Sequence, residues 1–182
     1  TLGTGVGGGI IIDGKIYSGS NYAGGELGLA LTHEEAITNM LTSYVSSYKD
    51  LPLYVFQFQK KFRNELRAKS GIMRTREFIM KDLYSFCADK EQHDEFYEKC
   101  AASYINIFKR LGIGDTTYRT FASGGSFSKF SDEFQTLCDA GEDIIYIDHE
   151  KNIALNEEVY NEETFKMLNI DPKKLDKQKA SE

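Results

Sequence analysis

The residues whose types and spacing best fit chemistry on a phosphate-bearing ligand lie in one stretch of the chain. Arg63 and Glu65 project from one face of an expected strand, because side chains alternate along a strand. Arg76 and Phe78 share one face of the strand expected to return beside it. An arginine next to an aromatic side chain can bind a phosphate through charge-assisted hydrogen bonds while a flat base stacks nearby. The pattern predicts an adenine-nucleotide site on a sheet, and a cross-strand ladder of salt bridges is the alternative interpretation.

Positive charge is concentrated around these residues. Between Lys60 and Asp82 the chain carries eight basic and three acidic residues, a local net charge of +5, whereas the whole chain has a net charge of −6. Clustered lysines and arginines focus a positive potential on an anionic ligand. The stretch therefore predicts contact with phosphates or nucleic acid, and a hairpin with solvated charges is the alternative.

Two strands and two helices are expected to position this stretch. Residues 54–65 and 76–87 are expected to form an antiparallel hairpin with a long basic tip, and long loops are often functional. One helix is expected from its N-cap at Thr32 through Tyr48. A second is expected from about Lys90 to Leu111, where the glycine that follows ends it.

The second half of the chain continues with further strands and a helical tail. Strands are expected over 116–123, 133–137 and 144–147. The tail from Asn156 reads as helical and contains a capped helix over 171–179. Because strands and helices occur in runs rather than in strict alternation, the expected fold class is α+β, an antiparallel sheet with flanking helices.

The distribution of glycine divides the chain near residue 28. Ten of the sixteen glycines lie in the first 28 residues. Residues 9–12 and 15–18 read as two strands joined by an Asp-Gly turn, the favoured two-residue hairpin connection. We therefore expect a glycine-rich β-hairpin segment over 1–28, followed by a larger domain over 29–182.

Composition limits the class of protein further. With 41% hydrophobic and 27% charged residues the chain is typical of a globular domain. It contains no run of roughly 20 apolar residues that could span a membrane, and its start carries no signal-peptide pattern, so a cytoplasmic location is expected. The three cysteines lack C-x-x-C spacing, which favours reduced, mostly buried thiols over a disulfide framework or a metal site.

Several motifs resemble the class II aminoacyl-tRNA synthetases, in their bacterial prolyl-tRNA synthetase form. Phe-Arg-Asn-Glu at 62–65 and the stretch 71–86 resemble motif 2 of that family. Residues 31–38 resemble its amino-acid-binding T-x-E element, and 124–126, 131–135 and 141–143 resemble the strands after motif 2. The resemblance covers about residues 29–182, and motifs 1 and 3 of the family are not visible. It therefore implies part of a catalytic domain. That this part is active by itself does not follow from the resemblance.

The resemblance implies ATP-dependent activation of proline and its ligation to tRNA(Pro), with ATP and Mg²⁺. Arg63 and Glu65 would be the catalytic residues. Arg63 would hold the α-phosphate of ATP and stabilise the charge that develops as the carboxylate attacks. Glu65 would orient the adenine or the motif 2 loop. Arg76 and Phe78 would complete the ATP site, with the aromatic ring near the adenine.

The remaining substrates and partners follow from the same resemblance. Thr32 and Glu34 would bind the imino group of proline, since a carboxylate suits a secondary ammonium. Arg67, Lys69 and Arg74 would meet the acceptor end of tRNA, whose phosphates need no sequence-specific readout. The intact family also implies a homodimer and no membrane partner.

The first 28 residues resemble a different family, the sugar kinases and repressors of the ROK family. Thr4 and Gly5 would contact nucleotide phosphates, and Glu26 would contact the sugar. Two alternatives to the synthetase interpretation of the chain stay open, and a further one concerns residues 1–28 alone. The chain could derive from a sugar kinase or a transcriptional repressor, it could be a non-catalytic nucleotide- or RNA-binding module, and its first residues could be an inactive lead segment.

Overall fold

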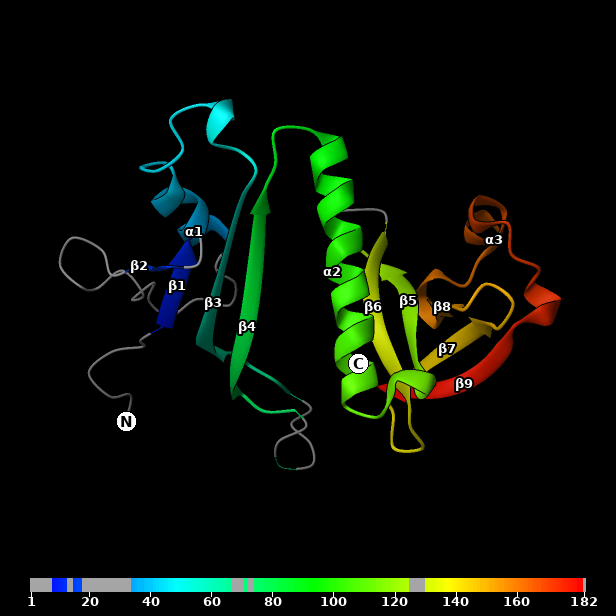
Figure 1. Ribbon diagram of the computed structural model, residues 1–182. Coiled ribbons are helices and arrows are strands. Elements are labelled where there is room, and N and C mark those ends of the chain that lie inside the picture. The colour runs from blue at the N-terminus through cyan, green and yellow to red at the C-terminus, as the bar shows by residue number, and fades with distance from the viewer. Residues whose placement is uncertain are drawn as a thin grey trace. The chain divides into compact units, whose positions relative to one another are not determined.

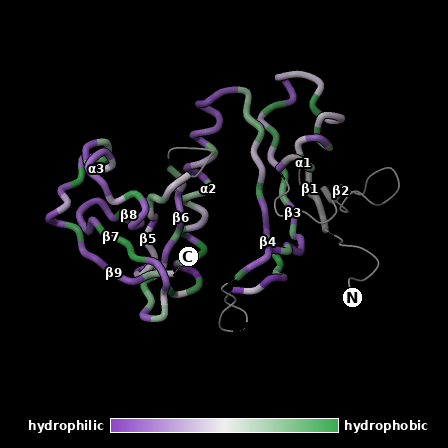
Figure 2. The backbone as a smooth tube through the Cα atoms, turned by 180° about the vertical axis from the view of Figure 1, so that it is seen from behind, coloured by the Kyte–Doolittle hydropathy of each residue, from purple (hydrophilic) through white to green (hydrophobic). Residues whose placement is uncertain are grey.

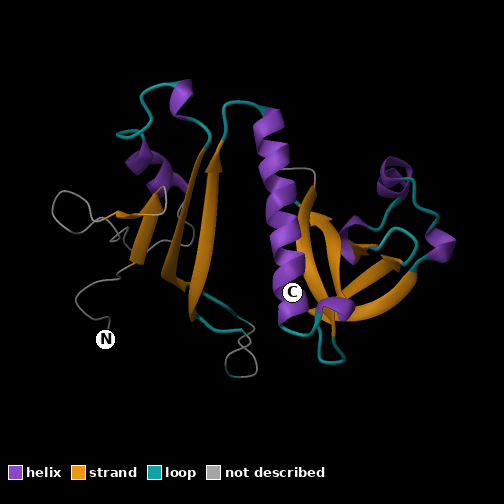
Figure 3. Ribbon diagram, viewed as in Figure 1, coloured by secondary structure: helices purple, strands orange, loops and turns teal. Residues whose placement is uncertain are grey.

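The computed structural model describes residues 8–12, 15–17, 34–66, 71, 74–124 and 130–181. The chain divides into two compact units, Thr1–Phe96 and Tyr97–Glu182. The α+β class expected from the sequence is confirmed, because each unit contains strands and helical segments (Figure 3). Within the described ranges, no helix is both long enough and apolar enough to cross a membrane. The boundary expected at residue 28 stays a prediction.

The first unit contains a four-stranded sheet in the order β2-β1-β3-β4, in which all neighbours are antiparallel (Figure 1). Its strands are β1 (Gly8–Ile12), β2 (Lys15–Tyr17), β3 (Leu53–Phe62) and β4 (Glu77–Phe86). β3 and β4 pair along their full lengths, from Leu53 opposite Phe86 to Phe62 opposite Glu77. The Asp-Gly turn expected between β1 and β2 lies outside the described residues.

Helix α1 (Glu34–Leu41) supplies the apolar core of the first unit. Ile37 and Leu41, one helical turn apart, pack with Leu53 and Val55 of β3. The helix expected to reach Tyr48 is therefore wrong in its extent, since only the 3-10 helix Tyr48–Asp50 follows it. A physical reason is local: Ser47 and Asp50 form a capping box that starts this separate short helix, and such side-chain bonds compete with a continuing α-helix.

Helix α2 (Lys90–Arg110) agrees closely with the expected helix over 90–111. Gly112 follows it with φ +80°, a left-handed conformation that favours glycine and ends the helix. Within the first unit, Phe96 stacks on Tyr54 with ring centroids 3.7 Å apart. Within the second unit, Tyr104 packs on Phe134 at 5.2 Å.

The second unit is built on a closed five-stranded barrel in the order β5-β6-β9-β7-β8. Its strands are β5 (Thr117–Ser123), β6 (Phe130–Leu137), β7 (Asp143–Asp148), β8 (Ile153–Asn156) and β9 (Asp176–Ser181). β5 and β8 pair in parallel, and the other neighbours are antiparallel. The barrel corrects the expected arrangement, which had an antiparallel sheet and no barrel.

The interior of the barrel is filled by small and branched side chains. Ile145 and Ile147 of β7, a strand that Figure 2 shows as hydrophobic, form a fully buried cluster with Ala154 and Ala180. A second cluster joins Leu155 of β8 to residues around the 3-10 helix Glu157–Val159 and the helix α3 (Glu162–Leu168). The helical tail expected from Asn156 is therefore partly correct.

Two elements of the barrel differ from the sequence expectation. β8 was not expected at all. The helix expected over 171–179 is limited to the 3-10 helix Pro172–Lys174, which Asp171 caps by accepting a hydrogen bond from the Lys173 backbone N–H. The chain then extends as β9, because this strand pairs with both β6 and β7 and closes the barrel. The capping residue Asp171 therefore starts a short helix, whereas pairing with distant strands determines the conformation of the residues that follow.

Candidate functional site

The hairpin of β3 and β4 brings Arg63, Glu65 and Arg76 together just beyond the ends of the strands. The Arg63 backbone N–H donates to the Arg76 carbonyl at 3.0 Å, which extends the ladder by one step. The Glu65 N–H donates to the Arg63 carbonyl at 2.8 Å, closing a three-residue turn. The Arg76 Nε donates to the Glu65 carbonyl at 2.9 Å. The expectation that Arg63 and Glu65 alternate along a strand is therefore wrong, because β3 ends at Phe62 and the chain turns.

Arg63 and Phe78 form a cation–π contact at this end of the hairpin. The Arg63 Cζ lies 5.4 Å from the centroid of the Phe78 ring, within the range of a favourable interaction. Phe78 is half-buried on β4, whereas Arg63 is exposed. An exposed cation, which suits a phosphate, therefore lies beside a flat apolar ring, which suits a base.

Glu34 is the first residue of α1 and is exposed. The pKa of Tyr84 on β4 is raised by burial, by the hydrogen bond to Asp82 and by the charges of Asp82 and Glu34. Glu34 therefore lies near the face of the sheet that α1 covers. Its partner in the T-x-E element, Thr32, lies outside the described residues.

The residues predicted to meet tRNA are described only in part. Arg67 and Lys69 lie outside the described residues, and Arg74 is half-buried shortly before β4. Their roles stay predictions. Thr4, Gly5 and Glu26, the residues of the sugar-kinase resemblance, also lie outside the described residues.

β3 carries a buried polar row that was not predicted from the sequence, formed by Gln57, Gln59 and Lys61. These three side chains continue the face of β3 on which Leu53 and Val55 pack against α1, because burial alternates along the strand. The side chain of Lys61 is only 2% exposed. A charged group at such a depth requires a partner.

That partner is Asp82 on β4, which lies 2.5 Å from the Lys61 Nζ. The same carboxylate oxygen accepts hydrogen bonds from the Gln57 amide at 3.0 Å and the Tyr84 hydroxyl at 2.8 Å. Burial by itself raises the pKa of Asp82, but the hydrogen bonds from Lys61, Gln57 and Tyr84 outweigh it, and the pKa is lowered. Asp82 is therefore held as a carboxylate inside the site.

This pairing corrects the interpretation of the basic stretch as one positive surface. Lys61 is buried and neutralised by Asp82, and Lys60 forms a half-exposed ion pair with Glu77 at 2.9 Å. The alternation of Gln57, Gln59 and Lys61 was a visible signal that these residues share a face. The register that places Gln57 opposite Asp82 was not visible, since it is a property of the paired strands.

The buried side chain of Gln59 lacks hydrogen bonds among the described residues. It is 1% exposed, and neither its Oε1 nor its Nε2 has a hydrogen-bond partner among the described residues. The Oε1 of Gln57 is likewise unpaired in the described part of the chain. Most buried polar atoms in folded proteins have at least one partner, so this carboxamide is available to a ligand.

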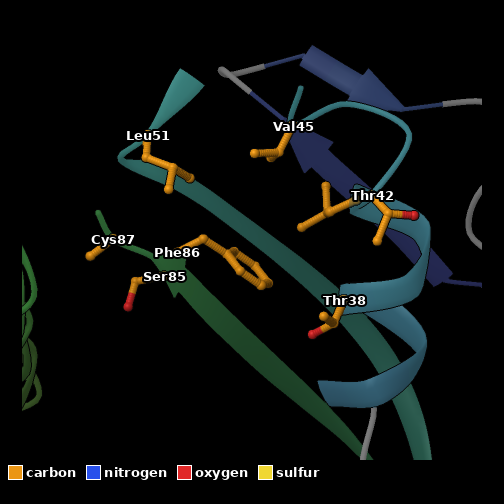
Figure 4. Close-up of a pocket in the computed structure, with 8 residues that line it drawn as sticks. Thr38, Thr42, Val45, Leu51, Ser85, Phe86 and Cys87 are labelled. Atoms are coloured by element: carbon orange, nitrogen blue, oxygen red, sulfur yellow. The ribbon is translucent and has the colours of Figure 1, made fainter. Parts of the chain in front are cut away.

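A separate apolar pocket of about 520 Å³ lies at the other end of the hairpin (Figure 4). Its lining comes from α1, the segment that follows α1, and the end of β4: Thr38, Leu41, Thr42, Val45, Leu51, Ser85, Phe86 and Cys87. None of the residues predicted to bind substrate belongs to this lining.

The three cysteines are not joined in disulfides. Cys87 and Cys100 are half-buried and Cys138 is exposed, so the expectation of mostly buried thiols is only partly correct.

Comparisons with known proteins identify relatives over most of the chain. The family model "tRNA synthetase class II core domain (G, H, P, S and T)" matches residues 17–173. A proline–tRNA ligase of Prochlorococcus marinus (strain MIT 9515) is 47% identical over 144 residues, which cover 79% of this chain and 24% of that protein. A proline–tRNA ligase of Vesicomyosocius okutanii is 42% identical over 162 residues, which cover 86% of this chain and 28% of that protein. The chain spans about a quarter of the length of the curated relatives it matches.

Proposed function

The chain belongs to the class II tRNA synthetase core family, and from this premise we propose that it is part of the catalytic domain of a proline–tRNA ligase. The names of the relatives support proline as the amino acid. The observation that carries the proposal is the contact between Arg63 and Phe78 at the end of the hairpin. It holds a cation next to an aromatic ring where motif 2 would bind ATP.

In the proposed reaction, a carboxylate oxygen of proline attacks the α-phosphorus of ATP. A bond forms between that oxygen and the phosphorus, the bond to the bridging oxygen breaks, and pyrophosphate leaves. Arg63 stabilises the negative charge that grows on the α-phosphate oxygens during this step. Phe78 packs near the adenine, and Arg76 and Glu65 hold the turn that carries Arg63 in place, through the hydrogen bonds that join them.

Proline binds at the end of the site near α1. Thr32 and Glu34 bind the secondary ammonium group, for which a carboxylate is chemically suited. In the second step a ribose hydroxyl of the tRNA attacks the activated carbonyl, the proton of the hydroxyl is lost to solvent, and AMP leaves. Arg67, Lys69 and Arg74 then hold phosphates of the acceptor end.

Mg²⁺ would reach this site on the phosphates of ATP. The residues that the structure describes contain no group of three or more histidine, cysteine, aspartate or glutamate side chains placed to hold a metal ion. This fits Mg²⁺, which commonly binds through substrate phosphates and water rather than through a protein cage. When bound, the ion would neutralise phosphate charge, as Arg63 does from the protein side.

Three further expectations complete the proposal. The intact protein forms a homodimer, and it works in the cytoplasm, where its tRNA substrate is used. The glycine-rich residues 1–28 form a segment distinct from the catalytic part, 29–182, which the glycine distribution supports; the family match overlaps the end of that segment from residue 17. The matches favour the ligase over the alternatives of a sugar kinase, a repressor fragment and a non-catalytic binding module.

Amino-acid-dependent exchange of pyrophosphate into ATP tests the proposal. The family description covers five amino acids, so glycine, histidine, proline, serine and threonine form the panel. With the missing portions of the catalytic domain supplied in trans, we expect exchange with proline and at most background with the other four. Arg63→Ala should reduce the exchange rate by about 10²- to 10³-fold, as the loss of one charge-stabilising group does.

Arg110→Ala is the matched control, because Arg110 is also an exposed arginine but lies at the end of α2. We expect it to keep the wild-type exchange rate. Exchange that depends on another amino acid of the panel would contradict the proposal. An equal loss in Arg63→Ala and Arg110→Ala would remove Arg63 from the mechanism.

A further inference from the structure

Among the described residues of the first unit, Gln59 has a buried carboxamide in which neither polar atom has a hydrogen-bond partner. The residue is 1% exposed. An unpaired buried amide is destabilising, because no hydrogen bond replaces those it made to water in the unfolded chain. A leucine of similar size would avoid that cost, so the retained amide indicates a binding role.

Gln59 lies between the two ends of the proposed substrate site. On the shared face of the hairpin, Lys61 is opposite Phe78, Gln59 is opposite Met80, and Gln57 is opposite Asp82. Phe78, near which the adenine would pack, therefore lies on one side of Gln59. Tyr84, which packs against the core cluster that contains Ile37 of α1, lies on the other side. Phe78 and Tyr84 are about 20 Å apart along the strand, since each residue advances it by about 3.3 Å.

A bound amino acid must cross this interval in one orientation. Its ammonium group faces Glu34, and its carboxylate must point toward the α-phosphate held by Arg63. The carboxylate therefore lies over the middle of the polar row. A carboxylate needs hydrogen-bond donors, and an anionic neighbour would repel it.

The neighbours of Gln59 on this face direct hydrogen bonds to Asp82 instead. The Lys61 ammonium, the Gln57 amide and the Tyr84 hydroxyl all donate to Asp82. Asp82 itself is a carboxylate, which is stabilised by these three bonds and repels another anion. Among the described side chains of the polar row, Gln59 is the one whose N–H donor has no partner.

We propose, on the basis of the proposed function, that Gln59 binds the carboxyl group of the amino acid substrate. Its Nε2 donates to the carboxylate oxygen that does not attack, which turns the attacking oxygen toward the α-phosphate of ATP. The Lys61–Asp82 pair lies beside it on the same face, and Asp82 accepts hydrogen bonds from the neighbouring Gln57 and Tyr84. Gln59 is therefore a substrate-binding residue that contacts the reacting group, whereas Lys61 and Asp82 are positioning residues.

Calorimetric titration of the full chain with proline and, separately, with ATP and Mg²⁺ tests this proposal. Gln59→Leu keeps the volume and removes both hydrogen-bonding atoms. We expect it to weaken proline binding by about tenfold or more, as the loss of a hydrogen bond to a charged group does, and to leave ATP affinity within about twofold. Gln59→Glu should weaken proline binding further, because its charge repels the carboxylate.

Gln135→Leu is the matched control. Gln135 lies on β6 of the barrel, is 1% exposed, and also has an Oε1 without a partner in the part of the chain that the structure describes. We expect it to bind proline and ATP as the wild type does. Pyrrolidine, which keeps the ring and the imino group but lacks the carboxyl group, should bind equally to the wild type and Gln59→Leu.

Each contrary result has a distinct meaning. Equal proline affinity in the wild type and Gln59→Leu overturns the assignment and leaves the ligase proposal standing. Equal weakening toward proline and ATP, or toward pyrrolidine, overturns it in favour of a structural role for Gln59. A wild-type chain that binds ATP but selects another amino acid in the exchange assay overturns the proposed function. A wild-type chain that binds neither proline nor ATP overturns both proposals.

Discussion

Each unit of the chain contains a largely buried aspartate paired with a basic residue, and the two pairs are built differently. In the first unit, the side chains of Lys61 and Asp82 are 2% and 10% exposed. In the second, those of Arg119 and Asp132 are 23% and 10% exposed. Arg119 also binds Glu98 of α2, a carboxylate that is 64% exposed, through two hydrogen bonds of 2.8 Å. The first pair is enclosed within one sheet, whereas the second ties a helix to the barrel.

The difference shows how buried charge serves two purposes. The planar fork of Arg119 satisfies two carboxylates at once and joins two elements, which is a structural role. Lys61 neutralises one carboxylate as a point charge, and the amide of Gln59 beside it has no hydrogen-bond partner within the described part of the chain. A buried ion pair contributes little net stability compared with apolar residues of the same volume. The pair in the first unit is therefore better explained by the organisation of a binding site.

Removing the carboxylate of the first pair should have the largest effect on stability. Asp82→Ala leaves the Lys61 ammonium buried without its counter-ion. We expect a loss of about 3–5 kcal/mol in the free energy of unfolding, measured by urea denaturation. The double variant Lys61→Met with Asp82→Leu should recover most of this loss, because it removes both charges. A loss of less than about 1 kcal/mol in Asp82→Ala would show that water reaches Lys61.

Removing the cation of the second pair should have a smaller effect. Arg119→Met keeps the length of the side chain but removes the guanidinium that donates to Asp132 and Glu98. We expect a loss of about 2 kcal/mol by the same measurement. Glu98→Gln should cost less than about 1 kcal/mol, since Glu98 is mostly exposed. Equal losses in the two variants would mean that the contact to α2, and not the buried Asp132, carries the energy.

The pH dependence of stability should distinguish Asp82 from a neutral substitute. Burial raises the pKa of Asp82, but hydrogen bonds, led by that from Lys61, lower it overall. The carboxylate therefore contributes stability that is fully present above the unfolded pKa of about 3.9 and is lost as pH falls through the lower folded value. The stability difference between the wild type and Asp82→Asn should be constant from pH 7 to 5 and shrink below pH 4. A difference that stays constant down to pH 2 would contradict the lowered pKa.

The smallest effect is expected at the lysine next to the buried pair. Lys60 and Glu77 form an ion pair in which both side chains are 54% exposed. Lys60→Met should change the free energy of unfolding by less than about 1 kcal/mol, because solvent screens the pair. Lys61→Met, one position along the strand, should cost more, since it leaves Asp82 buried without its cation. Similar losses of unfolding free energy in the two lysine variants would contradict the difference between the exposed and the buried face of β3.

Local patterns in the sequence predicted much of the fold. The spacing from Lys90 to Leu111 predicted α2 almost to the residue, because a helix is stabilised by contacts within itself. The hairpin carrying Arg63 and Phe78 also followed from alternation and from the motif resemblance. The barrel did not, since β9 is a strand only through its pairing with β6 and β7. Its local signals, Asp171 and Pro172, predicted a helix start that extends for one short turn.

The sequence by itself determined the family of the chain and the segment that we propose to carry its chemistry, because both follow from contiguous motifs around Arg63 and Glu34. Only the tertiary structure decided which charges of that segment are available to a ligand. Lys61 meets an aspartate 21 residues away, and Gln59 meets no partner among the described residues. The physical reason is that burial and register arise from the pairing of distant strands, whereas a motif records only neighbours along the chain.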